Sequence, residues 1–173
     1  MALVFSNVFK FSTQGVSYLA FVLIGLTYFN YYSEASNLAM SSVVANFSLI
    51  NKVYIPKYLF VLSRVASSGI NILSSFCALI LVMLFTRTEL HFTMFLSIIP
   101  IVYLMIFSLG VGLILAALTV KFRDVMHLYT VFLTALMYLT PIIYPLSMLP
   151  DKVRFIVNLN QLTGILGIFR DVM

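Results

Sequence analysis

The chain consists mainly of long apolar runs separated by short polar connections. Four runs, at 16–45, 60–86, 92–120 and 126–147, are long enough to cross a bilayer, since an α-helix needs about 20 residues to span a hydrocarbon core of about 30 Å. Apolar residues follow one another without the alternation of a membrane strand, so the spans are helical. The predicted fold class is therefore all-α: a polytopic membrane helical bundle with four clear spanning helices.

The polar connections and the C-terminal segment differ in length and character. The first connection covers 46–59, and the other two are the short stretches TRTELH and KFRDVMH. After Pro150, the sequence DKVRFIVNLNQLTGILGIFR is interrupted by asparagines and a glutamine. We expect residues 150–170 to form one or two short interfacial helices on the outer side rather than a fifth span. No internal repeat or soluble domain is visible, so the sequence indicates a single membrane domain.

Composition supports a membrane protein. Of the 173 residues, 62% are hydrophobic and 9% are charged, whereas about a quarter of a soluble domain is charged. Lysine and arginine stand singly or in pairs at the ends of apolar runs, as expected for anchors at lipid headgroups, and this pattern argues against a nucleic-acid partner. The ten basic residues divide equally between the two sides, so charge alone does not set the orientation. Cys77 is the single cysteine, and no disulfide framework exists.

Polar residues inside the first predicted span follow one helical face. Asn30, Glu34, Asn37 and Ser41 recur at spacings of three and four. A carboxylate at membrane depth is costly and usually faces a bundle interior or a wet cavity. The row therefore has two interpretations: a hydrophilic path, or a Glu34 that lies near headgroups or pairs with another helix.

Two further rows have small or polar residues at every fourth position. Residues that are small allow helix backbones to approach closely, so we interpret these rows as packing faces rather than substrate contacts. The rows are Ser67, Asn71 and Ser75 in the second span, and Ser108, Gly112 and Ala116 in the third.

Signatures of an enzyme are absent from the sequence. No G-x-x-x-x-G-K-[ST] motif occurs, so the chain lacks the P-loop that ATP hydrolysis commonly uses. His91 and His127 stand apart from each other and from Cys77, and they form no metal-ligand set. The five carboxylates are scattered, whereas a membrane-embedded transferase would normally cluster acidic residues. We predict no catalytic residue, no metal and no cofactor in this chain.

Two long segments resemble a known family. LINKVYIPKYLFVLSRVASSGINIL and VKFRDVMHLYTVFLTALMYLTPIIYPLSMLPDKVRFIVNLNQL are similar to permease subunits of ABC-2-type exporters of lipid-linked polysaccharide, the O-antigen, teichoic-acid and capsule group. The matching positions are Lys52, Val53, Tyr54 and Pro56, then Phe122, Arg123 and Asp124, then TPIIYPLSMLP at 140–150. The motifs occur in the family's order and spacing over nearly the whole chain.

The chain also departs from the family pattern. It contains no tryptophan, although the family usually has one in the stretch corresponding to LTYFNYY, and LNQ replaces the usual L-N-P at 159–161. Family members have six spans. By the resemblance, residues 1–12 form the tail of a first span, and we expect the sequence to represent a subunit truncated at both ends.

The resemblance implies partners and a location. It implies a permease in the cytoplasmic membrane of a bacterium or archaeon, surrounded by membrane lipids and paired with a second copy of itself. Its substrate would be a lipid-linked glycan, and a separate ABC subunit would bind ATP and Mg²⁺. The alternatives are an ABC-2 exporter of a drug or another amphiphile, a membrane-embedded transferase, or an inert scaffold subunit.

The resemblance also assigns roles to segments. It places 46–59 and 121–127 in the cytoplasm and 86–92 and 150–170 outside. The segment 46–59 would couple the permease to the ATP-binding subunit; the alternative is an ordinary basic loop on lipid phosphates. The expected coupling residues are Leu49, Ile50, Lys52, Val53, Tyr54, Ile55 and Pro56, and the cytoplasmic motif is Phe122, Arg123 and Asp124.

A substrate path is expected among aromatic residues near polar faces and proline breaks. Aromatic rings offer a flat apolar surface that suits sugars, although interfacial belts use the same residues. The candidate path residues are Phe29, Tyr31, Tyr32, Glu34, Tyr138 and Tyr144, and the candidate gating breaks are Pro141 and Pro145.

Overall fold

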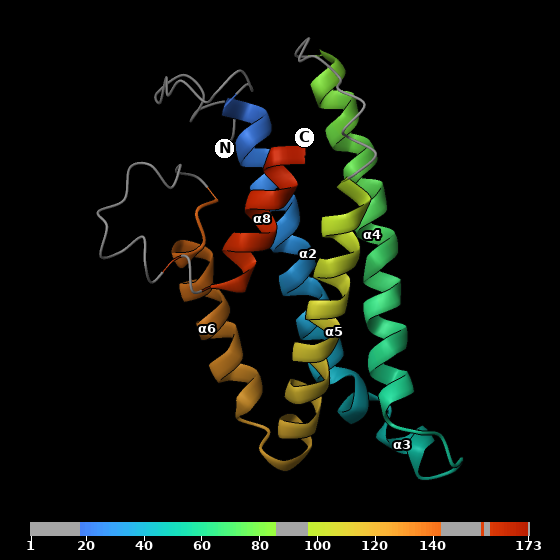
Figure 1. The fold of residues 1–173 in the computed structure, drawn as a ribbon. Helices are drawn as coiled ribbons and strands as arrows, with labels where there is room; N and C mark the ends of the chain where they lie inside the picture. The colour runs from blue at the N-terminus through green and yellow to red at the C-terminus, as the bar shows by residue number, and fades with distance from the viewer. Residues whose placement is uncertain (1–17, 86–96, 143–156, 158–159, 173) are drawn as a thin grey trace.

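The computed structural model describes residues 18–85, 97–142, 157 and 160–172. All regular structure within these residues is helical (Figure 1), which confirms the predicted all-α class. The helices are α2 (Tyr18–Ala45), α3 (Phe47–Ile50), α4 (Tyr58–Phe85), α5 (Ile98–Lys121), α6 (Val125–Leu139) and α8 (Gln161–Val172). The four helices α2, α4, α5 and α6 run up and down the bundle in alternation, and α8 lies alongside α2.

Helix α2 lies at the centre of the bundle. It packs mainly against α4 and α5, and also contacts α6 and α8. Of the α2 side chains that the structure describes, only Asn30, Glu34 and Ala45 are exposed. Its buried hydroxyls bond to its own backbone: Ser36 Oγ donates to the Tyr32 carbonyl at 2.7 Å, and Ser42 Oγ donates to the Ala39 carbonyl at 2.6 Å. The buried hydroxyls of Ser36 and Ser42 are therefore satisfied within α2 itself.

The other long helices expose large apolar side chains on their outer faces. Ile70 on α4, Ile106 on α5 and Val131 on α6 are 69%, 64% and 70% exposed. A soluble monomer rarely exposes apolar patches of this extent. By length and composition, two described helices can cross a membrane: the Tyr58–Ala78 part of α4, and α5. The other two predicted spans correspond to α2 and α6 and do not meet both the length and the composition needed to cross a membrane. Helix α2 carries many polar residues, and α6 has 15 residues.

Close packing joins α5 to α2 through small residues. A Cβ atom added at Gly112 would lie 2.5 Å from the Cβ atom of Ala39, so the two backbones approach more closely than larger side chains would permit. Ser108 and Ala116, one turn to either side of Gly112, are buried as well. The predicted packing row of the third span is confirmed.

Helix α6 ends well before the predicted end of its span at 147. The last helical residue is Leu139, and Thr140 is extended at φ −81° and ψ 132°. Pro141 explains this end, because proline has no N–H to continue the ladder and disfavours the helical conformation of the residue before it. The break at Pro141 is therefore real, and it shortens α6.

Helix α8 differs from the expected interfacial helix. Its residues Leu162, Ile165, Leu166 and Phe169 are buried, and the helix packs against α5 and α2. These positions follow the i, i+3, i+4, i+7 pattern of one helical face, and the bundle covers that face. Within 160–172, the chain is part of the bundle core.

Several sequence predictions fall outside the described residues. They concern the expected tail of a first span at 1–12, the connection at 86–92, most of 150–160, and the residues Tyr144 and Pro145. The helix bounds that can be compared agree with the predicted spans to within a few residues, apart from the end of α6. The predicted start of the third span at 92 lies outside the described residues.

The contact of Gly112 with Ala39 predicts a stability loss on a small substitution. We expect Gly112→Ala to destabilise the bundle by about 1–3 kcal/mol, because overpacking forces the two helices apart. The matched control is Gly110→Ala in the same helix, where an added Cβ meets no atom within 4 Å. Melting of both variants in detergent checks this. An unchanged melting temperature for Gly112→Ala would contradict the α2–α5 packing.

Candidate functional site

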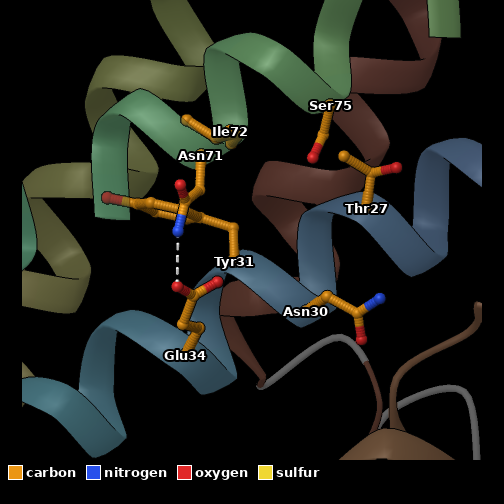
Figure 2. A pocket seen from close by; sticks show the side chains of 7 residues that line it. All are labelled: Thr27, Asn30, Tyr31, Glu34, Asn71, Ile72 and Ser75. Atoms are coloured by element: carbon orange, nitrogen blue, oxygen red, sulfur yellow. Dashed lines mark hydrogen bonds between the residues drawn. The ribbon is translucent and has the colours of Figure 1, made fainter. Parts of the chain in front are cut away.

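A pocket opens between α2 and α4 near the middle of both helices (Figure 2). Its volume is about 90 Å³. It is lined by Thr27, Asn30, Tyr31 and Glu34 from α2 and by Asn71, Ile72 and Ser75 from α4. The Asn71 amide Nδ2 donates a hydrogen bond to Glu34 Oε1 at 2.6 Å, and this bond ties the two helices together across the pocket.

The pocket is formed where two predicted polar rows meet. Asn30 and Glu34 come from the row of the first span, and Asn71 and Ser75 come from the row of the second. The bond to Asn71 confirms that Glu34 pairs with another helix. Its carboxylate also lines a polar pocket, and a hydrophilic path stays a prediction. The second row was interpreted as a packing face, and Asn71 and Ser75 instead face the pocket.

The polar path does not continue along the whole row of α2. Asn37 Nδ2 donates to the Ser33 carbonyl at 2.9 Å, and Ser41 Oγ donates to the Asn37 carbonyl at 3.1 Å. These side chains bond to their own helix. The row does extend in the other direction to Thr27, which sequence reasoning missed although it stands three residues before Asn30 and so continues the same spacing.

The pocket mixes hydrogen-bond donors and acceptors. Glu34 Oε2 and the Asn71 side-chain oxygen are acceptors, whereas the Asn30 amide and the hydroxyls of Thr27 and Ser75 can donate. This set suits a ligand that carries many hydroxyl groups. The negative charge of Glu34 disfavours phosphate groups at the same place. Among the described residues, no group of three or more His, Cys, Asp or Glu could hold a metal ion.

The predicted aromatic path residues that the structure describes do not gather on one surface. Phe29 and Tyr32 are buried in the core at 4% exposure each, and the Tyr32 ring stacks on Phe107 with centroids 5.8 Å apart. Tyr31 is also buried and forms part of the pocket wall. Tyr138 lies exposed on α6, away from the pocket lining. Of the candidate path residues, the structure brings together Tyr31 and Glu34.

The predicted coupling segment lies at one end of the bundle, around α3 (Figure 1). The N–H groups of Lys52 and Val53 both bond to the Leu49 carbonyl at 3.1 Å, which closes a turn after α3. Ile50 packs against the cluster formed by α2, α4 and α5, and Ile55 is half-buried. The Ile50 side chain therefore anchors the segment to the bundle.

Other apolar residues of the coupling segment point outward. Tyr54 is 100% exposed and Val53 is 51% exposed, and Phe47 and Leu49 are exposed too. Pro56 precedes α4, and its carbonyl accepts the Leu59 N–H at 3.1 Å. Together the four exposed side chains form an apolar patch, which we call the α3 patch. The lysines Lys52 and Lys57 at its rim are exposed.

The turn between α5 and α6 lies at the same end of the bundle as α3 (Figure 1). Phe122 is extended and 55% exposed, and the Lys121 ammonium lies 5.4 Å from its ring centroid. Asp124 stands at the N-cap of α6, and its carbonyl accepts the N–H groups of His127 and Leu128 at 3.1 Å. Its carboxylate is favourable at a helix N-terminus. Arg123 is exposed.

Sequence reasoning missed the position of Arg170. The sequence suggested a basic anchor on the outer side, but the structure places this side chain against the break after α6. Arg170 Nη1 donates to the Pro141 carbonyl at 2.8 Å. The signal that could have indicated this position is Gly25, whose lack of a side chain leaves room for the guanidinium.

The family and the individual proteins that this chain matches agree with one another. The chain matches the family described as ABC-2 type transporter over residues 1–173. Two proteins of Klebsiella pneumoniae named O-antigen export system permease protein RfbA are 27% and 26% identical to it, and each match covers 99% of this chain and 67% of the relative. A protein of the same name from Myxococcus xanthus is 31% identical over 76% of this chain and 51% of that relative.

The bond between Asn71 and Glu34 predicts energetic coupling between the two positions. We expect Glu34→Ala and Asn71→Ala each to lower the stability of the purified protein in detergent, and the double variant to lose less than the sum. The expected coupling is about 0.5–1 kcal/mol, the net value of one partly exposed hydrogen bond. Asn30→Ala is the control, because its effect should add to that of Asn71→Ala. Simple additivity of Glu34→Ala with Asn71→Ala would contradict the bond.

Proposed function

The chain belongs to the ABC-2 type transporter family, and we propose that it is the permease subunit of an exporter of lipid-linked polysaccharide. The observation that carries this proposal is the match of O-antigen export permeases to 99% of the chain. A separate subunit would bind ATP and Mg²⁺ and supply the energy, because this sequence has no P-loop. The chain itself performs transport rather than catalysis.

The surface properties support a place within the lipid bilayer. The exposed sides of α4, α5 and α6 carry many large apolar side chains. In the described part of the chain, the basic residues Lys52, Lys57, Lys121 and Arg123 lie at one end of the bundle. Because the basic residues of the whole sequence divide equally between the two sides of the predicted spans, the resemblance to the family, rather than charge, supports the orientation. We infer that this end faces the cytoplasm, that the chain crosses the cytoplasmic membrane several times, and that it works as a homodimer.

The α3 patch is the proposed contact with the ATP-binding subunit. It presents apolar side chains, with a fully exposed tyrosine, at the proposed cytoplasmic end, where lipid tails would not cover them. Tyrosine in a pocket of a partner is a frequent source of binding energy. Ile50 ties the patch to α2 and α4, so a push on the patch would reach the centre of the bundle. The turn with Phe122, Arg123 and Asp124 lies at the same end and could add to this contact.

The pocket between α2 and α4 is the proposed contact with the glycan. Its hydroxyl and amide groups match the hydroxyls of sugars, and the Glu34 carboxylate would keep the anionic phosphates of the carrier away. A polar lining of this kind favours a hydroxyl-rich substrate over an apolar drug. Tyr138 and the break at Pro141 remain candidates for the path and the gate.

The proposed orientation can be tested by labelling. In a Cys77→Ser background, cysteine at Ser48 should resist an impermeant thiol reagent in intact cells, because it would lie in the cytoplasm. Cysteine at Thr88 should react, because it would lie outside. Both should react in opened membranes, which is the control for reactivity. Labelling at 48 with none at 88 in intact cells contradicts the orientation.

The proposed function can be tested together with the α3 patch. Cells that lack this permease should keep the glycan inside, and the full-length permease with its ATP-binding partner should restore it to the cell surface. The double variant Val53→Ala, Tyr54→Ala should insert normally but lose co-purification of the partner and lose export. It spares Ile55, which is half-buried.

A matched control separates docking from a general loss of apolar surface. Leu128→Ala with Val131→Ala removes exposed side chains on α6 (69% and 70% exposed), where lipid is the expected neighbour, so co-purification and export should persist. If the variant at Val53 and Tyr54 still binds the partner and exports, the α3 patch is a lipid-facing loop. If the unaltered permease restores no surface glycan, the proposed substrate is wrong.

A further inference from the structure

The guanidinium of Arg170 binds main-chain carbonyls from two distant segments. Nη1 donates to the Pro141 carbonyl at 2.8 Å, and Nη2 donates to the Ile142 carbonyl at 3.0 Å and to the Phe21 carbonyl at 3.4 Å. The centre of the guanidinium lies 3.5 Å from the centroid of the Phe21 ring. One side chain at the end of α8 therefore joins the first turns of α2 to the residues that follow α6.

If α6 continued beyond Leu139, the carbonyls of Pro141 and Ile142 would accept hydrogen bonds from N–H groups within the helix. Because Pro141 ends the helix, these groups need other donors. The C-terminal end of a helix carries a partial negative charge, so a cation beside it is favourable. The flat fork of an arginine can reach several carbonyls at once and stack on a ring, which the single ammonium of a lysine cannot.

Gly25 makes this arrangement possible. It stands four residues after Phe21, on the same side of α2. A Cβ atom at this position would lie 2.9 Å from Arg170 Nη2 and 3.0 Å from Cγ2 of Ile142. Any larger residue would push the guanidinium or the break away from α2. The absent side chain thus leaves the Phe21 carbonyl open to Arg170.

A second bond ties the beginning of α8 to the same break. The Asn160 amide Nδ2 donates to Thr140 Oγ1 at 3.2 Å, and Asn160 Oδ1 accepts the Leu162 N–H at 3.1 Å at the start of α8. The break is therefore held from both ends of α8, by Asn160 at one end and by Arg170 at the other. Thr140, Pro141 and Ile142 are almost wholly buried as a result.

We propose that Arg170 is a positioning residue that latches the Pro141 break against α2, and that export requires this latch. Its relevance to export rests on the proposed function, whereas the latch itself rests on the geometry. The buried Nε of Arg170 has no hydrogen-bond partner among the described residues, so burial of the cation is incompletely compensated. A contact of this kind can be released at lower cost than a fully satisfied one.

Accessibility at the break tests the latch directly. In full-length permease with Cys77→Ser, cysteine at Ile142 should react slowly with a maleimide in isolated membranes, because this position is 1% exposed. Arg170→Gln should speed labelling on the order of tenfold, equivalent to about 1.4 kcal/mol of easier opening. Arg170→Lys should give an intermediate rate, since it restores the charge without the fork.

Glycine variants supply the matched comparison. Gly25→Ala should imitate Arg170→Gln, and the two changes together should add little to either alone, because they act on one contact. Gly167→Ala is the control: it lies on α8 with Arg170, gains the same helix propensity, and its added Cβ meets no atom within 4 Å. Labelling and export should not change in this control.

A second cysteine probe distinguishes release of the latch from a general loss of structure. Cysteine at Val65, which is 2% exposed in the cluster near α3, should stay protected in Arg170→Gln. Faster labelling at Ile142 alone, with loss of export at normal membrane abundance, supports the proposal. An unchanged rate at Ile142, or equally faster labelling at both probes, overturns the latch. Faster labelling with full export overturns its role in transport. If the unaltered permease does not export the glycan, the proposed function is wrong. The labelling rates at Ile142 and Val65 still test the latch independently.

Discussion

The close approach of α5 to α2 at Gly112 and Ala39 is the constraint on which the bundle depends. Because the two backbones approach closely at this point, α2 can lie among its neighbours and bury four aromatic side chains, Tyr28, Phe29, Tyr31 and Tyr32. The exposed part of α2 is then reduced to Asn30, Glu34 and its last residue. The polar pocket exists because two of these three residues meet the gap between α2 and α4 (Figure 2).

The sequence was sufficient to predict the helices and their polar faces, but not what covers each face. Spacing placed Asn30 with Glu34 and Asn71 with Ser75, and both pairs line one pocket. Spacing could not tell that α8 would cover the side of α2 that bears Tyr28, whose ring lies 6.5 Å from that of Phe169. Phe29 and Tyr32, expected to face a substrate, are therefore core residues. Long-range contacts such as that of Arg170 with Pro141 leave no periodic signal, and only packing reveals them.

Charge is distributed along the bundle in a way that suits an amphiphilic cargo. Within the described ranges, exposed cations gather around α3 and the turn before α6, and a carboxylate lies halfway along α2. An anionic headgroup would be attracted to the basic end and repelled from the middle, whereas uncharged sugars would meet no such barrier. Only a few polar residues determine this charge distribution, and most of the surface is apolar.

The exposed side chains around α3 bear on how the complex is assembled. A subunit without its partner presents Tyr54, Val53 and Phe47 to water, and patches of this kind are recognised by chaperones and proteases during quality control. Docking would hide them. If the proposed docking surface is correct, the residues that would receive the force of ATP hydrolysis would also mark an orphan subunit, and permeases made in excess of their ATP-binding partner would be removed.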